Sequence, residues 1–331
     1  MKKNINFWKN KNILITGGAG FIGSNLANNL IKISKSITVL DNLERGNSNN
    51  LHQGIKFIKI DLRAKSKKLI HYIQSSDIVI HLASKVGGIS FYENNAYDIL
   101  KENILIDSNV LDCVINSGVK FYFYASSSHI YPHKYQKHYK VKTLKESDSD
   151  SSHPTLSYGW AKLIGEKNIE FASSLNKNIN YSIGRLVGIY GPNQDTDLSN
   201  GSLIPVLCKR AVNYPNFNFE IKTNGKEIRS YCHINDAITL IKKLIESSNS
   251  KKKDFIYNIC SDEYYSIDQI AKKIIKISKK KIQLKKTHIE GSIKSQFCSN
   301  KKIINKVNWS PKIKLDEGLE SVYFDIKSKN F

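Results

Sequence analysis

Short apolar segments recur along the first half of the chain, and stretches with apolar residues at helical spacing separate them. Apolar runs of this length between turn residues are typical of buried strands. We predict strands at 12–16, 37–40, 55–60, 77–82 and 120–125. Strands that alternate with helices form a parallel sheet with helices on both faces. The pattern therefore predicts an α/β fold with a doubly wound sheet, in which ligands bind at the carboxyl ends of the strands.

The first predicted strand leads directly into a glycine-rich turn. Gly17, Gly20 and Gly23 follow it, and the next residues continue at helical spacing. In a strand–turn–helix unit, the first glycine permits the tight turn and the second lets a pyrophosphate approach the backbone. The third lets the helix pack on the strand, and the phosphates rest on the helix N-terminus. This order of elements predicts a dinucleotide site.

Asp41 ends the second predicted strand, 18 residues after Gly23. A carboxylate at this place accepts hydrogen bonds from both ribose hydroxyls and repels a 2′-phosphate, which favours NAD over NADP. The alternative is an ordinary turn aspartate. The next strands end at Asp61, at the segment 83–88 and at the segment 126–129, so we expect these residues around the ligand.

A tyrosine and a lysine four residues apart lie on one face of a predicted helix at Tyr158 and Lys162. An ammonium group near a phenol favours its ionised form, so the pair could deprotonate a carbinol. The chain contains three such pairs, and spacing alone therefore selects none of them. Tyr158 is distinguished because it follows Ser127, a strand-end serine, by 31 residues, which completes a Ser, Tyr, Lys set.

Composition narrows the class of partner. The chain has 331 residues, with 51 Lys plus Arg against 29 Asp plus Glu, and a formal net charge of +22. Only five basic residues are arginines and the lysines are dispersed, so we expect no nucleic-acid binding but an attraction for a polyanionic substrate. The five scattered cysteines indicate neither a disulfide framework nor a metal site. No apolar stretch approaches a membrane span and the N-terminal segment is polar, so we expect no membrane association and a cytoplasmic protein.

Further motifs join those above along the chain. The set is TGGAGFIG at 16–23, DN at 41–42, DL at 61–62, HLA at 81–83, SS at 126–127, YGWAK at 158–162, Arg185 with YGP at 190–192, and Arg229 with Asp236. Together these motifs resemble the extended short-chain dehydrogenase/reductase family that acts on sugar nucleotides. The resemblance implies hydride transfer between a sugar carbon, usually C4, and a tightly held NAD. Tyr158 would be the base, Lys162 would lower its pKa and hold the nicotinamide ribose, and Ser127 would donate a hydrogen bond to the reacting oxygen. The implied cofactor residues are Gly17, Gly20, Phe21, Ile22, Gly23, Asp41, Asn42, Asp61, Leu62, Leu82, Ala83 and Lys162.

The loop KVGGI at 85–89 and the IYP at 130–132 resemble the branch of GDP-mannose 3,5-epimerases and GDP-L-fucose synthases. The resemblance implies a GDP-hexose substrate. Gly87 and Gly88 could let the loop close on a sugar ring, or they could simply form a turn. Arginine suits a pyrophosphate, so Arg229 is the candidate for the substrate diphosphate, and a surface ion pair is the alternative. The expected substrate residues are Lys85, Gly87, Gly88, Ser128, His129, Arg185 and Arg229.

The chain departs from that branch at its acid/base groups. His129 stands where the related epimerases use a catalytic Cys, and their second group would fall near Ser202 or Leu203, neither of which is a good proton donor. His129 could shuttle a proton, because its ordinary pKa of about 6.5 suits such work, or it could only hydrogen bond the substrate. A C4 epimerase, a net 4-oxidase or 4-ketoreductase, and a non-catalytic dinucleotide-binding protein therefore remain as alternatives.

We expect a dinucleotide-binding domain at 1–181 and a mainly substrate-binding domain at 182–331, with some later segments returning to the first sheet. Further strands are predicted at 217–222 and 255–259. The SIDQ at 266–269 predicts a capping box that opens a helix. Family resemblance implies a homodimer formed through the helices near 100–116 and 158–174.

Overall fold

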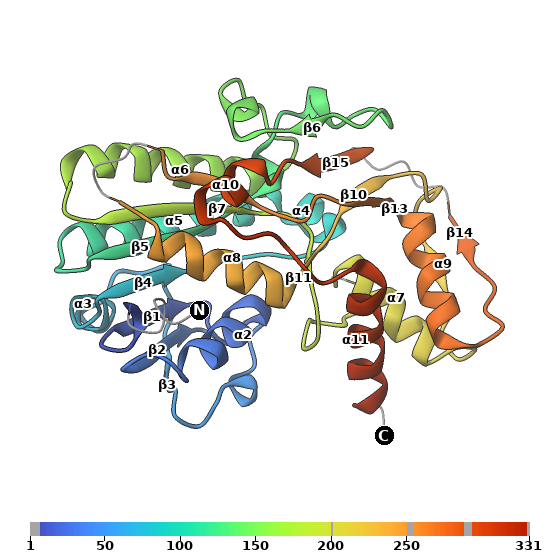
Figure 1. Ribbon diagram of the computed structural model, residues 1–331, viewed down its shortest axis with the longest axis horizontal. Coiled ribbons are helices and arrows are strands. Elements are labelled where there is room, and N and C mark those ends of the chain that lie inside the picture. The colour runs from blue at the N-terminus through green and yellow to red at the C-terminus, as the bar shows by residue number, and fades with distance from the viewer. Residues whose placement is uncertain (1–6, 200, 250–253, 288–292, 330–331) are drawn as a thin grey trace.

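The computed structural model describes residues 7–199, 201–249, 254–287 and 293–329 (Figure 1). Its centre is a parallel sheet of seven strands in the order β12-β7-β5-β4-β1-β2-β3. The prediction of a doubly wound α/β fold is confirmed. The strands are β1 (Asn12–Thr16), β2 (Ser36–Asp41), β3 (Lys56–Lys59), β4 (Ile78–His81), β5 (Phe121–Ser127), β7 (Asn180–Leu186) and β12 (Ile256–Ile259).

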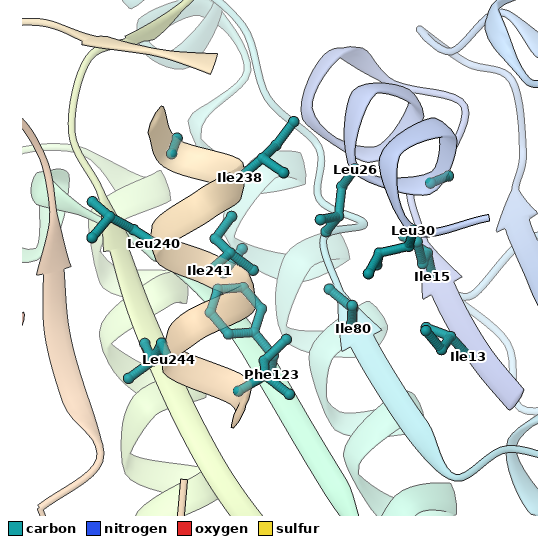
Figure 2. Packing of buried hydrophobic residues seen from close by; sticks show 14 of the residues in the cluster. Ile13, Ile15, Leu26, Leu30, Ile80, Phe123, Ile238, Leu240, Ile241 and Leu244 are labelled. Atoms are coloured by element: carbon teal, nitrogen blue, oxygen red, sulfur yellow. The ribbon is translucent and has the colours of Figure 1, made fainter. Parts of the chain in front are cut away.

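Helices cover both faces of this sheet because each strand sends alternate apolar side chains to opposite faces. One face packs against α2 (Phe21–Leu30) and α8 (Ile234–Glu246), and the other packs against α3 (Lys67–Gln74), α5 (Ala96–Ile115) and α6 (Ser157–Leu175). Figure 2 shows the first face, where isoleucines and leucines of the two helices meet side chains of β1, β4 and β5. The two helical layers therefore cover the central strands β1, β4, β5 and β7, which are largely buried.

The chain order and the spatial order differ in the second half. β7 extends across the expected division at residue 181. β12 is an edge strand of the seven-stranded sheet, and α8 and α10 (Lys301–Val307) pack on that sheet. The apolar face of α8, with Ile238, Ile241 and Leu244, explains this return, because it completes the layer beside α2 (Figure 2). Segments after 182 therefore contribute to both parts of the molecule.

A second group of elements gathers at the other end of the molecule (Figure 1). Three helices pack on one another there, α7 (Leu203–Val212), α9 (Ile267–Ser278) and α11 (Leu315–Ser328). The expected capping box opens α9, because the Ser266 side chain accepts from the Gln269 amide and the Gln269 side chain accepts from Ser266. The small strands are β6 (Thr143–Leu144), β8 (Ile189–Tyr190), β9 (Glu220–Ile221), β10 (Ile228–Ser230), β11 (Cys232–His233), β13 (Tyr264–Ser266), β14 (Lys285–Lys286) and β15 (Ser295–Cys298).

Two sequence expectations differ in detail from the structure. The strand expected at 217–222 is only the two residues of β9, because Phe219 turns into the apolar cluster of α7, α9 and α11. The strand expected at 120–125 continues to Ser127 in β5, which pairs with β7 as far as Leu186. This extension carries Ser127 to the carboxyl edge of the sheet. Among the described helices, none combines the length and apolar character that crossing a bilayer requires.

Candidate active site

The glycine turn lies at the point where the strand order of the sheet reverses. β1 and β4 are neighbours there, and the loops that follow them run in opposite directions. Gly17 has a positive φ of 66°, and a Cβ at this position would stand 2.6 Å from the Ala83 backbone nitrogen. A side chain is therefore excluded by both strain and space. α2 begins at Phe21 directly after Gly20, so its first amide groups face the same opening.

Asp41 is held against this turn. It is the last residue of β2 and is 8% exposed, and its two carboxylate oxygens accept the amides of Ala19 at 3.0 Å and Leu43 at 2.8 Å. Each carboxylate oxygen has further acceptor capacity. A fixed carboxylate beside a glycine turn and a helix N-terminus fits the ribose and pyrophosphate of a dinucleotide.

An open cavity continues from Asp41 along the carboxyl edge of β2 and β3. Its volume is about 460 Å³, and it is lined by Asn42, Glu44, Lys59, Ile60, Asp61 and Arg63. Asp61 binds the Arg63 side chain, and this hydrogen bond holds the pKa of Asp61 below its ordinary value. Leu62 is buried beneath this edge, while Leu82 and Ala83 lie half-buried next to the glycine turn. The structure thus brings the expected cofactor residues to one edge of the sheet.

The Ser, Tyr, Lys set meets at the end of β5. Tyr158 lies in the first turn of α6 and is 8% exposed, and its hydroxyl interacts with the side chains of Ser127 and Ser84. His129 lies beside them, with its Nδ1 at 3.0 Å from the Ser127 Oγ. Two hydroxyl groups and an imidazole therefore surround the phenol.

Lys162 lies one helical turn after Tyr158, but its ammonium group points to a carboxylate. Its Nζ is 3.8 Å from Asp107 Oδ1 and 4.6 Å from the centre of the Tyr124 ring, while the Tyr158 ring is at 6.0 Å. Burial lowers the pKa of Lys162, and Asp107 opposes this effect. The pKa of Tyr158 lies well above its ordinary value because of burial and the nearby Tyr92 and Asp107, although Ser84 and Ser127 act against this rise.

Asp107 is a buried residue of α5 that the sequence reasoning missed. It accepts hydrogen bonds from His81 Nε2 at 3.0 Å and from the Tyr124 hydroxyl, and His81 Nδ1 lies 2.6 Å from the Thr16 hydroxyl. Burial alone raises the pKa of Asp107, but Lys162, His81 and Tyr124 outweigh it and hold the pKa below its ordinary value. An ionised carboxylate therefore fixes Lys162 beneath Tyr158. The sequence offers no clear signal for Asp107, because α5 also contains Asp98, Glu102 and Asp112.

Arg185 has no hydrogen-bond donor left for a ligand, which argues against its expected role in substrate binding. Its side chain is fully buried between β7, α6 and the loop before α6, and all five N–H groups have protein acceptors. They donate to both oxygens of Glu166, to the Tyr131 and Ser149 hydroxyls and to the Glu146 carbonyl. A guanidinium has five donors and no more, so none remains for a substrate.

Arg229 lies on β10 and is half-buried beside His129. Its guanidinium donates to the carbonyls of Ile228 at 2.8 Å and Ile293 at 2.9 Å, and neither acceptor is a carboxylate. Burial lowers its pKa. Burial and the charge of Arg229 also lower the pKa of His129 to about 4, so the imidazole is neutral at pH 7. This guanidinium therefore remains a candidate for a diphosphate, and the alternative of a surface ion pair does not fit its surroundings.

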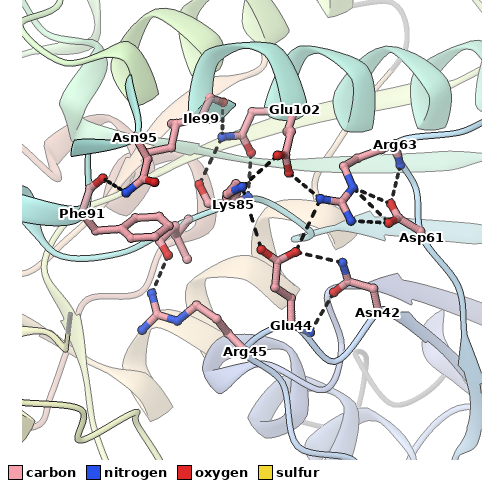
Figure 3. Close-up of polar contacts among 12 residues, drawn as sticks. Asn42, Glu44, Arg45, Asp61, Arg63, Lys85, Phe91, Asn95, Ile99 and Glu102 are labelled. Carbon is pink, nitrogen blue, oxygen red and sulfur yellow. Dashed lines mark hydrogen bonds and ion pairs between the residues drawn. The ribbon is translucent and has the colours of Figure 1, made fainter. Parts of the chain in front are cut away.

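The loop after β4 is fixed by side chains of α5 (Figure 3). The Lys85 Nζ is 2.8 Å from Glu102, and Asn103 binds the amide of Lys85 at 2.8 Å and its carbonyl at 3.1 Å. Gly88 then precedes the short helix α4 (Ile89–Asn94). Ser128 is buried, and its carbonyl accepts from Gln296 at 3.4 Å. Lys85 therefore has a carboxylate partner of its own, which a substrate phosphate would have to compete with.

These features together are typical of an oxidoreductase that uses a dinucleotide. They are the doubly wound sheet, the glycine turn, the carboxylate at the end of β2 and the buried Ser, Tyr, Lys set. The chain matches the model of the NAD dependent epimerase/dehydratase family over residues 13–260. This protein belongs to that family, as the motifs indicated, and it is an enzyme whose cofactor is NAD.

Individual relatives extend over nearly the whole chain. The GDP-mannose 3,5-epimerase of Arabidopsis thaliana is 30% identical over 329 residues, which cover 98% of this chain and 84% of that protein. A putative UDP-glucose 4-epimerase of Methanocaldococcus jannaschii is 28% identical, covering 96% and 99%. The structure of Thermotoga maritima UDP-glucose 4-epimerase with UDP-glucose superimposes with a TM-score of 0.84 at 26% identity, covering 95% and 98%. The relatives thus include epimerases of both GDP- and UDP-sugars.

Proposed function

We propose that this protein is an NAD-dependent sugar-nucleotide epimerase that oxidises C4 of the hexose to a transient 4-keto sugar. The observation that carries the proposal is the arrangement around Tyr158, whose phenol lies with Ser127, Ser84 and His129 at the carboxyl edge of the sheet, next to the glycine turn. A phenol and a hydroxyl donor at one point suit deprotonation of a carbinol.

Different residues of the chain would bind the cofactor and act on the C4 hydroxyl. Bound NAD would supply a hydride acceptor at C4 and return the hydride later. The turn from Gly17 to Gly23 and Asp41 would hold its pyrophosphate and ribose, and Lys162 would lie under its nicotinamide end. Tyr158 takes the proton of the C4 hydroxyl, and the Ser127 hydroxyl donates to the same oxygen. Asp107 keeps Lys162 in place through the 3.8 Å ion pair.

The substrate in this proposal is a GDP-hexose, and the reaction resembles that of GDP-mannose 3,5-epimerases. The support is the similarity to the Arabidopsis thaliana enzyme and the Lys85 to Gly88 loop. Arg229 would bind the diphosphate, because a planar guanidinium suits two phosphate oxygens. The second candidate is a C4 epimerase, dehydrogenase or ketoreductase of another sugar nucleotide, which the similarity to UDP-sugar 4-epimerases favours.

Tyr158→Phe tests the proposal with GDP-mannose and UDP-glucose as substrates. We expect turnover to fall by about 100-fold or more, because general acid–base groups contribute on that order, while NAD stays bound. Tyr97→Phe is the matched control, since Tyr97 and Lys101 have the same spacing on α5 but Tyr97 is 74% exposed. Wild-type rates in the Tyr158 variant would overturn the assignment.

We also propose that the enzyme works as a homodimer in the cytoplasm. α5 and α6 lie side by side (Figure 1) and expose four large apolar side chains, Tyr97, Leu105, Phe171 and Leu175. Exposed apolar side chains on neighbouring helices suit a protein interface. A second copy of the same helix pair would cover them in a symmetric dimer.

A further inference from the structure

Tyr92 is a titratable side chain in direct contact with the catalytic candidates. It lies on α4, after the loop with Gly87 and Gly88, and is 5% exposed. Its ring stacks on the Tyr158 ring, with the two centres 4.9 Å apart and the planes 9° from parallel. The His129 ring meets both tyrosine rings edge-on at 5.8 Å. Three titratable side chains therefore pack against one another.

The loop before α4 is shaped to bring Tyr92 there. A Cβ at Gly87 would stand 2.4 Å from the Phe91 ring, so only glycine lets α4 fold back this closely. On the other side, the Arg45 side chain binds the Val86 carbonyl and Asp195. Figure 3 shows Arg45 reaching across to this loop. The loop that leads into α4 is thus bound by Arg45, and Asp195 binds Arg45 in turn.

The surroundings of Tyr92 suit a proton donor. Burial raises its pKa to about 12, so the phenol keeps its proton at neutral pH. The Gly87 amide, which hydrogen bonds to the phenol, and the charge of Arg45 both act in the opposite direction. These two groups would stabilise the phenolate that forms once the proton is given away. Among the buried tyrosines near the site, Tyr124 instead has the Asp107 carboxylate as its partner, which disfavours its phenolate.

His129 is suited to the complementary step. Burial and Arg229 keep the imidazole neutral at pH 7. Its Nδ1 lies 3.0 Å from the Ser127 Oγ. In the tautomer whose Nδ1–H donates to this oxygen, the Nε2 lone pair is available to accept a proton. A neutral base and a protonated phenol therefore stand next to each other beside Tyr158.

We propose that His129 and Tyr92 are the base and the acid that invert a ring carbon next to C4 of the sugar. This inference rests on the proposed function, because only a 4-keto group makes the neighbouring C–H acidic enough to remove. It also accounts for the absence of a proton donor at Ser202 and Leu203. A hexose entering beside Tyr158 would separate the His129 and Tyr92 rings and leave one on each of its faces.

The step balances without a further reactant. The His129 Nε2 takes the proton from the carbon next to the C4 carbonyl, and the C–H electron pair forms the enolate, whose oxygen receives hydrogen bonds from Tyr158 and Ser127. The enolate carbon then takes the Tyr92 hydroxyl proton on its opposite face, and the ketone reforms. His129 ends as imidazolium and Tyr92 as phenolate. Proton exchange with solvent restores both groups.

The test is to incubate the holoenzyme with GDP-mannose in deuterated water and to measure deuterium separately in recovered substrate and inverted product. Tyr92→Phe keeps the stacked ring and removes only the hydroxyl. We expect it to form inverted product about 100-fold more slowly, while recovered substrate still gains deuterium because His129 removes and returns the proton on one face. His129→Gln should lose deuterium uptake in both. Tyr72→Phe on α3, which packs on a face of the sheet outside the site, should match the wild type.

Absorbance of reduced NAD during the same reactions separates the two proposals. Wild-type protein that reduces NAD and makes product without ring deuterium next to C4 would overturn the His129 and Tyr92 pair but leave the C4 oxidation standing. Inverted, deuterated product at the wild-type rate from Tyr92→Phe would also overturn the pair. Wild-type protein that neither reduces NAD nor converts GDP-mannose or UDP-glucose would overturn the proposed function and this inference together.

Discussion

His129 shows how a single environment decides what a side chain can do. An exposed histidine is half protonated near pH 6.5, whereas burial and Arg229 bring the pKa of this one to about 4. Its neighbour Tyr92 is shifted the other way, to about 12. Burial disfavours the charged form of both groups, and the result is a neutral base beside a neutral acid across the physiological range.

The pKa of His129 gives a prediction with a definite sign. Its folded pKa is below its unfolded value, so between about pH 4 and 6.5 the unfolded chain binds more protons than the folded one. The stabilisation from keeping His129 neutral is therefore complete above pH 6.5 and is lost as the pH falls toward 4. We expect the advantage of wild type over His129→Gln in thermal unfolding to shrink over this window. An imidazole NMR signal of His129 that titrates near pH 6.5 would contradict this.

At the residue scale, part of the site could be predicted from the sequence. Tyr158, Ser127 and His129 were found because each follows a strand end or a motif. Asp107 and Tyr92 could not be predicted as site residues, because each reaches the site only when its helix packs beside the end of β5. Arg185 was assigned to the substrate because arginine is rare in this chain and suits phosphates, but its five donors are used inside the protein. No local pattern distinguishes a buried guanidinium from an exposed one.

At the scale of elements, the Arg185 and Glu166 pair connects β7 to α6, and both side chains are buried. Removing one partner of a buried pair leaves an uncompensated charge, at a cost of about 3 to 5 kcal/mol. We expect Glu166→Gln to lower the free energy of unfolding by about that amount in urea titrations. Glu170→Gln is the control on the same helix, since Glu170 pairs with Lys167 at the surface and should change stability by less than about 1 kcal/mol. Equal effects of the two variants would contradict this account.

The ends of the strands give a prediction about the cofactor. Asp41 and Asp77 both accept backbone amides, but Asp41 ends β2 at the ligand edge and Asp77 precedes β4 at the opposite edge. We expect Asp41→Asn to weaken NAD binding by about 10-fold or more, the equivalent of about 1.4 kcal/mol. Asp77→Asn should leave the affinity unchanged. Calorimetric titration of the two variants with NAD measures the difference, and equal affinities would remove Asp41 from the cofactor site.

Most elements of the sheet followed from the sequence because fully buried strands appear as short apolar runs between turn signals. The prediction of a strand at 217–222 was less accurate, because Phe219 belongs to a helical cluster that brings together residues more than 100 positions apart. The return of α8 to the first sheet was likewise not evident locally. Its apolar face predicts burial but not the surface that it covers.

For the whole molecule, the proposed dimer makes a prediction that the fold alone does not. Phe171 is 69% exposed on α6, and a charge in the centre of an apolar interface would oppose association. We expect Phe171→Glu to shift the protein from dimer to monomer in sedimentation analysis. Phe324→Glu on α11, where the side chain is 54% exposed, is the matched control and should remain dimeric. A wild-type protein that is monomeric would contradict the proposal.

The central claim is that the enzyme oxidises C4 of a sugar nucleotide with its own NAD. The most direct measurement is to supply GDP-mannose or UDP-glucose deuterated at C4 and to determine the mass of the cofactor extracted during turnover. We predict that NAD gains deuterium from one of these substrates with wild-type protein and gains none with Tyr158→Phe. Product formed with no deuterium passing through the cofactor would contradict the account.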